Sequence, residues 1–130
     1  MSIGNQAGYQ AYQKNKYGTA SPHKLILLLY EAAIKHIGHA QQAINDRQVF
    51  TAHRSILKAQ EIISELIAVL NEDQGGEVAV NLKNLYLYVI DCLVKANLRK
   101  QTEPLQQALD VLGPLKSAWE QIGKEVSIGT

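Results

Sequence analysis

Residues 52–66 read AHRSILKAQEIISEL, and their apolar residues recur at alternating steps of four and three positions. The series runs through Ala52, Ile56, Ala59, Ile63 and Leu66. An α-helix turns once in about 3.6 residues, so this spacing keeps the apolar residues on one face. A half-buried strand would instead alternate with a period of two, which this segment does not do. The segment therefore predicts an amphipathic helix with one buried face.

Three other segments show the same spacing, and each predicts a further helix. The four apolar seams are Ile26, Tyr30, Ala33, Ile37, Ala40 and Ile44; Val49, Ala52, Ile56, Ala59, Ile63, Leu66 and Leu70; Val78, Leu82, Leu85, Val89, Cys92 and Ala96; and Leu105, Ala108, Leu112, Leu115, Trp119 and Ile122. Four amphipathic helices with short connections are typical of an antiparallel up-and-down four-helix bundle. The predicted fold class is all-α.

Residues that favour helix ends predict where the first two helices begin and end. Ser21 is a good N-cap, and Pro22 suits the first helical position, so the first helix begins there and runs to about Ile44. Asp46 is expected to cap the second helix, which runs to about Asn71.

The third and fourth helices have their own signals. The pair Gly75-Gly76 predicts a break before a third helix over about 77–98, and Thr102 is expected to cap the fourth, which reaches about Gly123. Pro114 lies inside the fourth helix, where proline removes one backbone hydrogen bond and bends the axis. The apolar seam resumes in phase after it, so we expect one kinked helix.

These boundaries divide the chain into three parts: a flexible N-terminal arm over 1–18, a four-helix bundle over 19–123 and a frayed tail over 124–130. The arm is rich in Gly, Asn and Gln, and Tyr9, Tyr12 and Tyr17 are its main apolar side chains. We expect a mobile arm that docks weakly, with these tyrosines as a loose anchor of the terminus.

Charge and composition exclude several function classes. The 130 residues suffice for one domain with a proper core, and a net charge of +1 disfavours a nucleic-acid-binding protein. The single cysteine, Cys92, lies in a seam and is expected to be buried, which suits a reducing compartment. The longest apolar run, at residues 25–30, is too short to span a bilayer, and residues 1–17 lack the apolar run of a signal peptide. We expect a soluble, cytoplasmic protein.

Two of the predicted helices carry apolar residues away from their seams. They are Val80, Leu87 and Val94, with Ile90 nearby, on the third helix, and Leu25, Leu28, Leu29 and Ala32 on the first. Contiguous exposed apolar residues usually mark an interface. The first and third helices lie on one diagonal of such a bundle, so an extended partner chain that wraps around it would reach both.

A wrapping partner has three alternatives, and all of them stay open. The first and third helices could be more deeply buried than the others, or the arm could cover the first helix. Two copies of the chain could also bury the third helix against each other in a homodimer. On the seam assignment, Leu87→Glu leaves the fold intact and Leu85→Glu unfolds it, because the second buries a charge.

The sequence shows no pattern typical of an enzyme, a metal centre or a cofactor site. No Glu is followed three residues later by His, as a di-iron bundle requires. His36 and His39 have no Cys or carboxylate at a useful spacing. His53 begins the segment HRSILK, but its lysine lies five positions on, unlike the usual spacing of phosphotransfer bundles.

Several segments carry a specific combination of motifs in a fixed order. They read TASPHKLILLLYEAAI at 19–34, KAQEIISEL at 58–66 and GGEVAVNLKNLYLYV at 75–89, followed by Ala96-Asn97 and the Ala-Trp pair at 118–119. Together they closely resemble the flagellar secretion chaperone FliS family, over about residues 9–122. Two departures are Glu31-Ala32, where the family often has Asp-Gly, and Pro114 in the last helix.

The resemblance implies an all-helical export chaperone that binds the disordered C-terminal region of flagellin in the cytoplasm. Such chaperones prevent premature polymerisation and deliver flagellin to the flagellar type III export apparatus. The resemblance also implies that Tyr9, Tyr12 and Tyr17 belong to an arm that folds over an apolar groove. A non-enzymatic adaptor or dimerisation module for another partner is the alternative.

The resemblance and the surplus apolar residues together define the expected partner-binding residues: Leu25, Leu28, Leu29, Val80, Tyr86, Leu87, Tyr88, Ile90 and Val94. Tyr86 and Tyr88 flank the third seam and suit the rim of a groove, although ordinary packing explains them equally well. Asn97 either caps the third helix or hydrogen-bonds a partner backbone.

Overall fold

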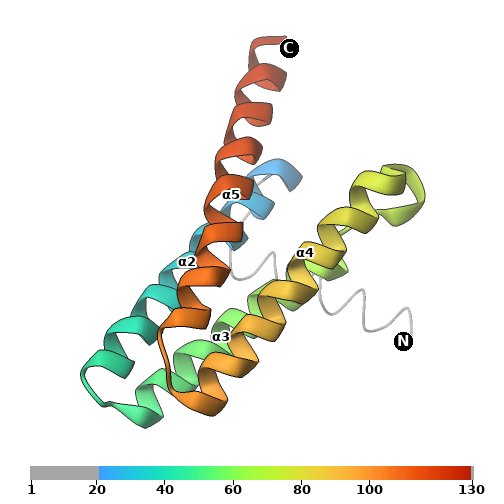
Figure 1. Ribbon diagram of the computed structural model, residues 1–130. Coiled ribbons are helices and arrows are strands. Elements are labelled where there is room, and N and C mark those ends of the chain that lie inside the picture. The colour runs from blue at the N-terminus through green and yellow to red at the C-terminus, as the bar shows by residue number, and fades with distance from the viewer. Residues whose placement is uncertain (1–20, 130) are drawn as a thin grey trace, which may run out of the picture.

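The computed structural model describes residues 21–129, which form four α-helices (Figure 1). The predicted arm over 1–18, with Tyr9, Tyr12 and Tyr17, lies outside this range, as does Thr130. The helices are α2 (Pro22–Asn45), α3 (Val49–Ala68), α4 (Glu72–Arg99) and α5 (Glu103–Gly129). The described chain contains no strand, and the predicted all-α bundle is confirmed.

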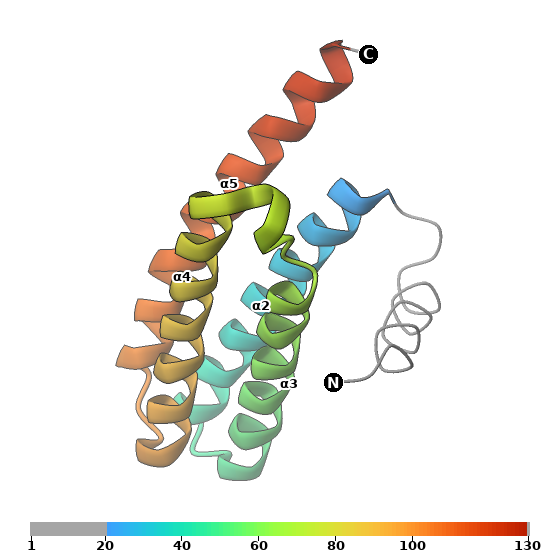
Figure 2. The same ribbon diagram turned by 90° about the vertical axis from the view of Figure 1, so that its right-hand side faces the viewer.

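The four helices form a closed ring in which each packs against the two beside it. α2 packs on α3 and α5, and α4 packs on the same two helices, so α2 and α4 face each other across a diagonal (Figures 1 and 2). The core lies inside the ring, and its largest fully buried side chains are Leu29, Ile37, Ile56, Ile63, Leu66, Val89, Leu93, Leu105 and Leu112. Cys92 is buried, as predicted.

The start of α2 is the one that the sequence predicts. Ser21 has extended backbone angles, and its hydroxyl accepts a hydrogen bond from the backbone N–H of Lys24 at 3.2 Å. This bond satisfies one of the amide groups that a helix leaves without a partner in its first turn. Pro22 follows at the first helical position, where no N–H is needed.

The connection between α2 and α3 differs from the prediction for Asp46. Asp46 is the C-cap of α2, and its carboxylate accepts hydrogen bonds from the Gln42 side chain at 3.1 Å. The N-cap of α3 is Gln48, which makes no side-chain capping bond. The prediction was wrong because Arg47 adopts a left-handed conformation, with φ 58°, between Asp46 and Gln48. The chain therefore turns after Asp46 and before α3 begins.

The break at Gly75-Gly76 is confirmed as a kink near the start of α4. Asn71 caps a short first turn by accepting from the Gln74 N–H at 3.1 Å, and Gly76 then takes the angles φ 54° and ψ −131°. Only glycine adopts such angles readily. At Gly75 an added Cβ would lie 2.8 Å from the Ala79 Cβ, so this position also has no room for a side chain.

α5 is one helix that continues through Pro114, as predicted. Figure 2 shows its second part tilted away from the line of the first. The helix extends to Gly129, six residues beyond the predicted end at Gly123. The carbonyl of Thr102 accepts from the Gln106 N–H at 3.0 Å, which places the start of α5 where the sequence predicts it.

Candidate partner-binding surface

The outer face of α4 carries three exposed apolar side chains spaced seven residues apart. Val80, Leu87 and Val94 are 44%, 48% and 38% exposed, which confirms that these residues lie outside the core. Seven residues are about two helical turns, so the three form one line along the helix. We call these three residues the α4 stripe.

The flank of α3 nearest to α4 adds a fourth apolar residue, Leu57, which is also exposed. Leu57 lies one turn after His53, whose Nδ1 accepts a hydrogen bond of 2.8 Å from the Asn97 side-chain amide on α4. Val94, the last residue of the α4 stripe, lies one turn before Asn97. Both helices therefore contribute apolar side chains beside their line of contact. We call Leu57 and the α4 stripe together the α3–α4 surface.

Sequence reasoning missed Leu57, because apolar residues away from a seam were identified only on the first and third predicted helices. The signal that could have found it was a large apolar residue off the seam, seven residues after Phe50, which is exposed too. Asn97 does not cap α4, whose C-cap is Lys100, and its other expected role, a hydrogen bond to a partner backbone, stays a prediction. It joins α3 to α4 through His53, and the Lys100 ammonium donates to its side-chain and main-chain oxygens.

The predicted seam of α4 is wrong at two positions, Val78 and Leu85, which are both exposed. Ala79 and Tyr86 are buried in their place, one residue further along the helix. The two possible seams share Leu82, Val89 and Ala96, and the residues that distinguish them are apolar in both cases. Contacts with α3 and α5 therefore select the seam, and spacing alone could not.

Two of the predicted partner-binding residues lie in the core, so their predicted exposure is wrong. Leu29 is fully buried, because the interior of the ring lies beside that flank of α2 as well as beside the seam. Tyr86 is 2% exposed. Leu25 and Leu28 are half-buried, Ile90 packs against the core, and Tyr88 is exposed.

Tyr86 is buried together with Tyr30 of α2, across the diagonal of the bundle. Their hydroxyl oxygens are 2.5 Å apart, so one hydroxyl donates to the other, and the rings are tilted by 54°. Burial raises the pKa of Tyr30 and of Tyr86 above 10.0, because a phenolate would lose its hydration there. The Tyr86 hydroxyl, which suggested a position at the rim of a groove, has its hydrogen-bond partner inside the protein.

The beginning of α2 is joined to the second part of α5 by a reciprocal pair of hydrogen bonds. The Trp119 ring N–H donates to the His23 carbonyl at 2.9 Å, and the His23 Nε2–H donates to the Trp119 carbonyl at 2.8 Å. The two rings stack with centroids 4.9 Å apart, and an added Cβ at Gly123 would overlap the His23 ring. These contacts hold α5 against α2 beyond Pro114.

The described residues contain no group of three or more His, Cys, Asp or Glu side chains that could hold a metal ion. His36 and His39 lie edge to face, with ring centroids 6.1 Å apart. Within the same range, no helix is long and apolar enough to cross a membrane.

Comparison with known proteins identifies the family. The family described as "Flagellar protein FliS" matches residues 5–126. The chain belongs to the FliS family. A flagellar secretion chaperone FliS of Bacillus subtilis is 35% identical over 121 residues, which are 93% of this chain and 88% of that protein. The Campylobacter jejuni FliS is 33% identical over 118 residues, 91% of this chain and 92% of its own length.

A solved structure supports the fold. It is described as "Crystal structure of flagellar chaperone from bacteria", and it superimposes with a TM-score of 0.76 over 93% of this chain and 98% of the other, at 19% identity. FliS proteins are chaperones, so membership of the family makes this protein a flagellar export chaperone and not an enzyme.

Proposed function

We propose that this chaperone binds the disordered C-terminal region of flagellin in the cytoplasm, prevents its premature polymerisation and delivers it to the flagellar export apparatus. The observation that carries the proposal is the α3–α4 surface, where four aliphatic side chains lie exposed along two adjacent helices. A segment that folds into an amphipathic helix on this surface would cover them.

The proposed interface draws its energy from the burial of apolar side chains. Fully burying one Val or Leu side chain contributes about 1.5 to 3 kcal/mol, and ordering a disordered segment costs about 2 to 5 kcal/mol or more. The four anchors are only 38% to 48% exposed, so each supplies about half of that amount, and further contacts along the segment must add to the affinity.

The half-buried residues Leu25 and Leu28 extend the proposed contact to α2. Because α2 and α4 lie on a diagonal, a compact ligand on α4 would not reach them. An extended flagellin segment that follows the ring of helices would reach both.

The test measures the affinity of a flagellin C-terminal peptide for Leu87→Glu, with Gln107→Glu as control. Gln107 is exposed on α5, so it accepts the same carboxylate away from the α3–α4 surface. Leu87→Glu should weaken binding by at least about tenfold with an unchanged circular dichroism spectrum, while the control binds normally. Equal affinities for the two variants would exclude this surface as the binding site.

A homodimer would bury the same stripe, and the mass of the chaperone alone in solution separates the two cases. If sedimentation shows a dimer that Leu87→Glu converts to a monomer, the stripe is a self-association surface. Delivery is tested in cells, where the Leu87→Glu variant should lower flagellin export and leave export of other flagellar subunits unchanged.

A further inference from the structure

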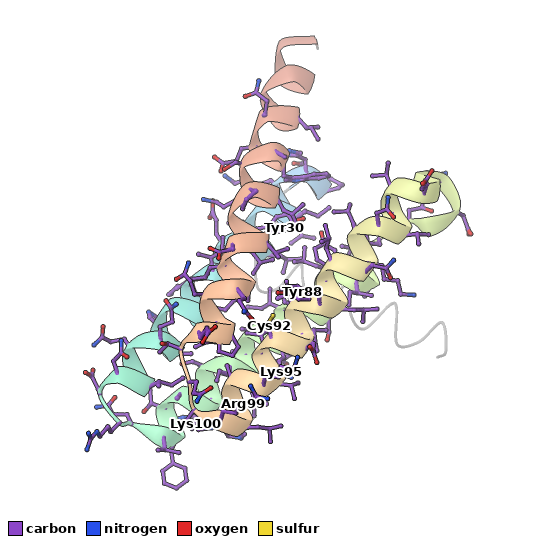
Figure 3. The ribbon with its side chains drawn as sticks, viewed as in Figure 1. Tyr30, Tyr88, Cys92, Lys95, Arg99 and Lys100 are labelled. Carbon is purple, nitrogen blue, oxygen red and sulfur yellow. The ribbon has the colours of Figure 1, made fainter. Side chains whose placement is uncertain are left out.

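The end of the bundle that carries the α2–α3 and α4–α5 connections has a surface of its own. It consists of residues 45–54 and 95–103, and we call it the loop end. Figure 3 labels Lys95, Arg99 and Lys100 along the last turns of α4, and the hydrogen bond between Asn97 and His53 places these turns beside the start of α3.

Two large apolar side chains of the loop end are almost fully exposed. Phe50 in the first turn of α3 is 83% exposed, and Leu98 near the end of α4 is 81% exposed. No other large apolar side chain of the described chain up to residue 123 is as open. Phe50 lies one turn before His53 and Leu98 follows Asn97, so both flank the same contact between α3 and α4.

The loop end is also the most basic part of the bundle. Five cationic side chains lie there against two carboxylates, which leaves a surplus of three in a chain whose net charge is +1. The cations are Arg47, Arg54, Lys95, Arg99 and Lys100, and the carboxylates are Asp46 and Glu103. Lys95 forms an ion pair of 3.0 Å with Asp91, just outside this region, and counting this carboxylate leaves a surplus of two.

Two of these cations occupy backbone positions that usually favour glycine. Arg47 has φ 58° and Lys100 has φ 51°, and no other non-glycine residue of the described chain has a positive φ. Glycine would adopt this conformation at less cost. Each connection at the loop end therefore carries a cation where local backbone preference alone would favour glycine.

We propose that the loop end is a second docking surface, for an acidic segment of a protein partner whose apolar side chains pack on Phe50 and Leu98. The positive surplus selects an acidic ligand, and the two exposed side chains select one with apolar residues among its carboxylates. The proposal does not depend on how the α3–α4 surface is used.

The two other anionic partners fit this surface less well. An anionic membrane is flat, so it would meet Asp46 and Glu103 together with the cations, whereas a narrow peptide can pass between them. Nucleic acid is usually bound along a continuous basic stripe. Here the positive surplus is confined to one end, which also exposes Phe50 and Leu98.

The test uses a fluorescent synthetic peptide of Glu, Leu and Ala in helical spacing, with two matched peptides as controls. One control replaces every Glu by Lys, and the other replaces every Leu by Ser. The isotope-labelled full-length chaperone should bind the acidic apolar peptide at least about tenfold more tightly than either control. Its NMR shift changes should fall within residues 45–54 and 95–103.

Variants of exposed residues then locate the interaction. Phe50→Ser and Arg99→Glu should each lower the affinity for the acidic peptide by about fivefold, which corresponds to the loss of one partly exposed contact. Lys58→Glu makes the same charge change on α3 outside the loop end, and Leu87→Glu alters the α3–α4 surface. Both should bind the peptide with an affinity within about twofold of the unaltered protein.

Three results would overturn the proposal. The first is an equal loss of peptide affinity in Lys58→Glu and Arg99→Glu, and the second is NMR shift changes centred on the α4 stripe. The third is tight binding to phosphatidylserine vesicles that Phe50→Ser abolishes, together with no binding of the acidic peptide. Leu87→Glu alters only the α3–α4 surface, so its effect on flagellin binding tests the proposed function. The conclusion for the loop end depends on the acidic peptide and does not change with that result.

Discussion

Tyr86 and Leu87 are neighbours on α4, and the more polar of the two is the more deeply buried. Tyr86 carries a hydroxyl and is 2% exposed, whereas the wholly apolar Leu87 is 48% exposed. Tyr86 faces α2 across the diagonal, where Tyr30 provides a partner for its hydroxyl at 2.5 Å. Burial on this helix thus follows from what lies opposite each side chain, and the residue's own hydrophobicity is secondary.

The same contrast separates the two faces of α4 along its length. The inner face contains Val89, Leu93 and Ala96, which pack in the core. The outer face contains the α4 stripe, with side chains of similar size and polarity. One face stabilises the monomer, and the other leaves apolar area available to a partner.

The strongest test of this contrast compares Leu93→Ala with Leu87→Ala. Removing the buried Leu93 side chain leaves a cavity and should lower the free energy of unfolding by about 2 to 5 kcal/mol. Leu87→Ala should lower it by about 1 kcal/mol or less, because about half of this side chain is exposed and its removal leaves no closed cavity. Urea denaturation followed by circular dichroism measures both, and equal losses would show that the two faces are not distinct.

The next test concerns the hydroxyl pair. Tyr86→Phe leaves the Tyr30 hydroxyl buried with its partner removed, which should cost about 1 to 3 kcal/mol, and Tyr30→Phe should cost a similar amount. The double variant lacks both hydroxyls and should cost less than the sum of the two. Strictly additive losses in the urea midpoints would show that the hydroxyls do not interact.

The hydroxyl pair also predicts a dependence of stability on pH. Both tyrosines have their pKa raised above 10.0 by burial, so below pH 10 they are neutral in the folded and the unfolded state. Above pH 10 the unfolded chain releases protons that the folded protein retains. Stability should then fall by up to about 1.4 kcal/mol per pH unit for each tyrosine. The variant carrying both Tyr30→Phe and Tyr86→Phe should lose stability less steeply, and parallel curves would contradict the assignment.

The last test concerns Leu85, which the spacing of the sequence places in the core. It is 39% exposed in the structure, so Leu85→Glu should leave the protein folded and lower its stability by about 1 kcal/mol or less. Val89→Glu on the same helix buries a charge and should unfold the protein. Loss of the helical circular dichroism signal in Leu85→Glu would restore the predicted seam.

Local signals in the sequence predicted most of the fold. The N-cap at Ser21, the first-turn Pro22 and the break at Gly75-Gly76 depend on the chemistry of a few adjacent residues, and all are found in the structure. Asp46 was wrongly assigned because two helices meet within a short connection, and a single carboxylate there could serve either end. Its bonds to Gln42 place it at the end of α2.

The candidate surface was only partly predictable. Val80, Leu87 and Val94 were identified because they recur every seven residues away from the seam. Leu57 was missed because its contribution depends on which flank of α3 lies beside α4. Leu29 and Tyr86 were misplaced because side chains close to a seam become buried or exposed according to the neighbouring helices.

The sequence by itself determined the number of helices, the cap at Ser21, the break at Gly75-Gly76 and the family, since all of these follow from residue order over short spans. Only the tertiary structure decided which of two overlapping seams on α4 turns inward, and that Tyr30 meets Tyr86 and His23 meets Trp119. The physical reason is that helical spacing defines faces within one segment, whereas burial depends on contacts between residues as far as 96 positions apart.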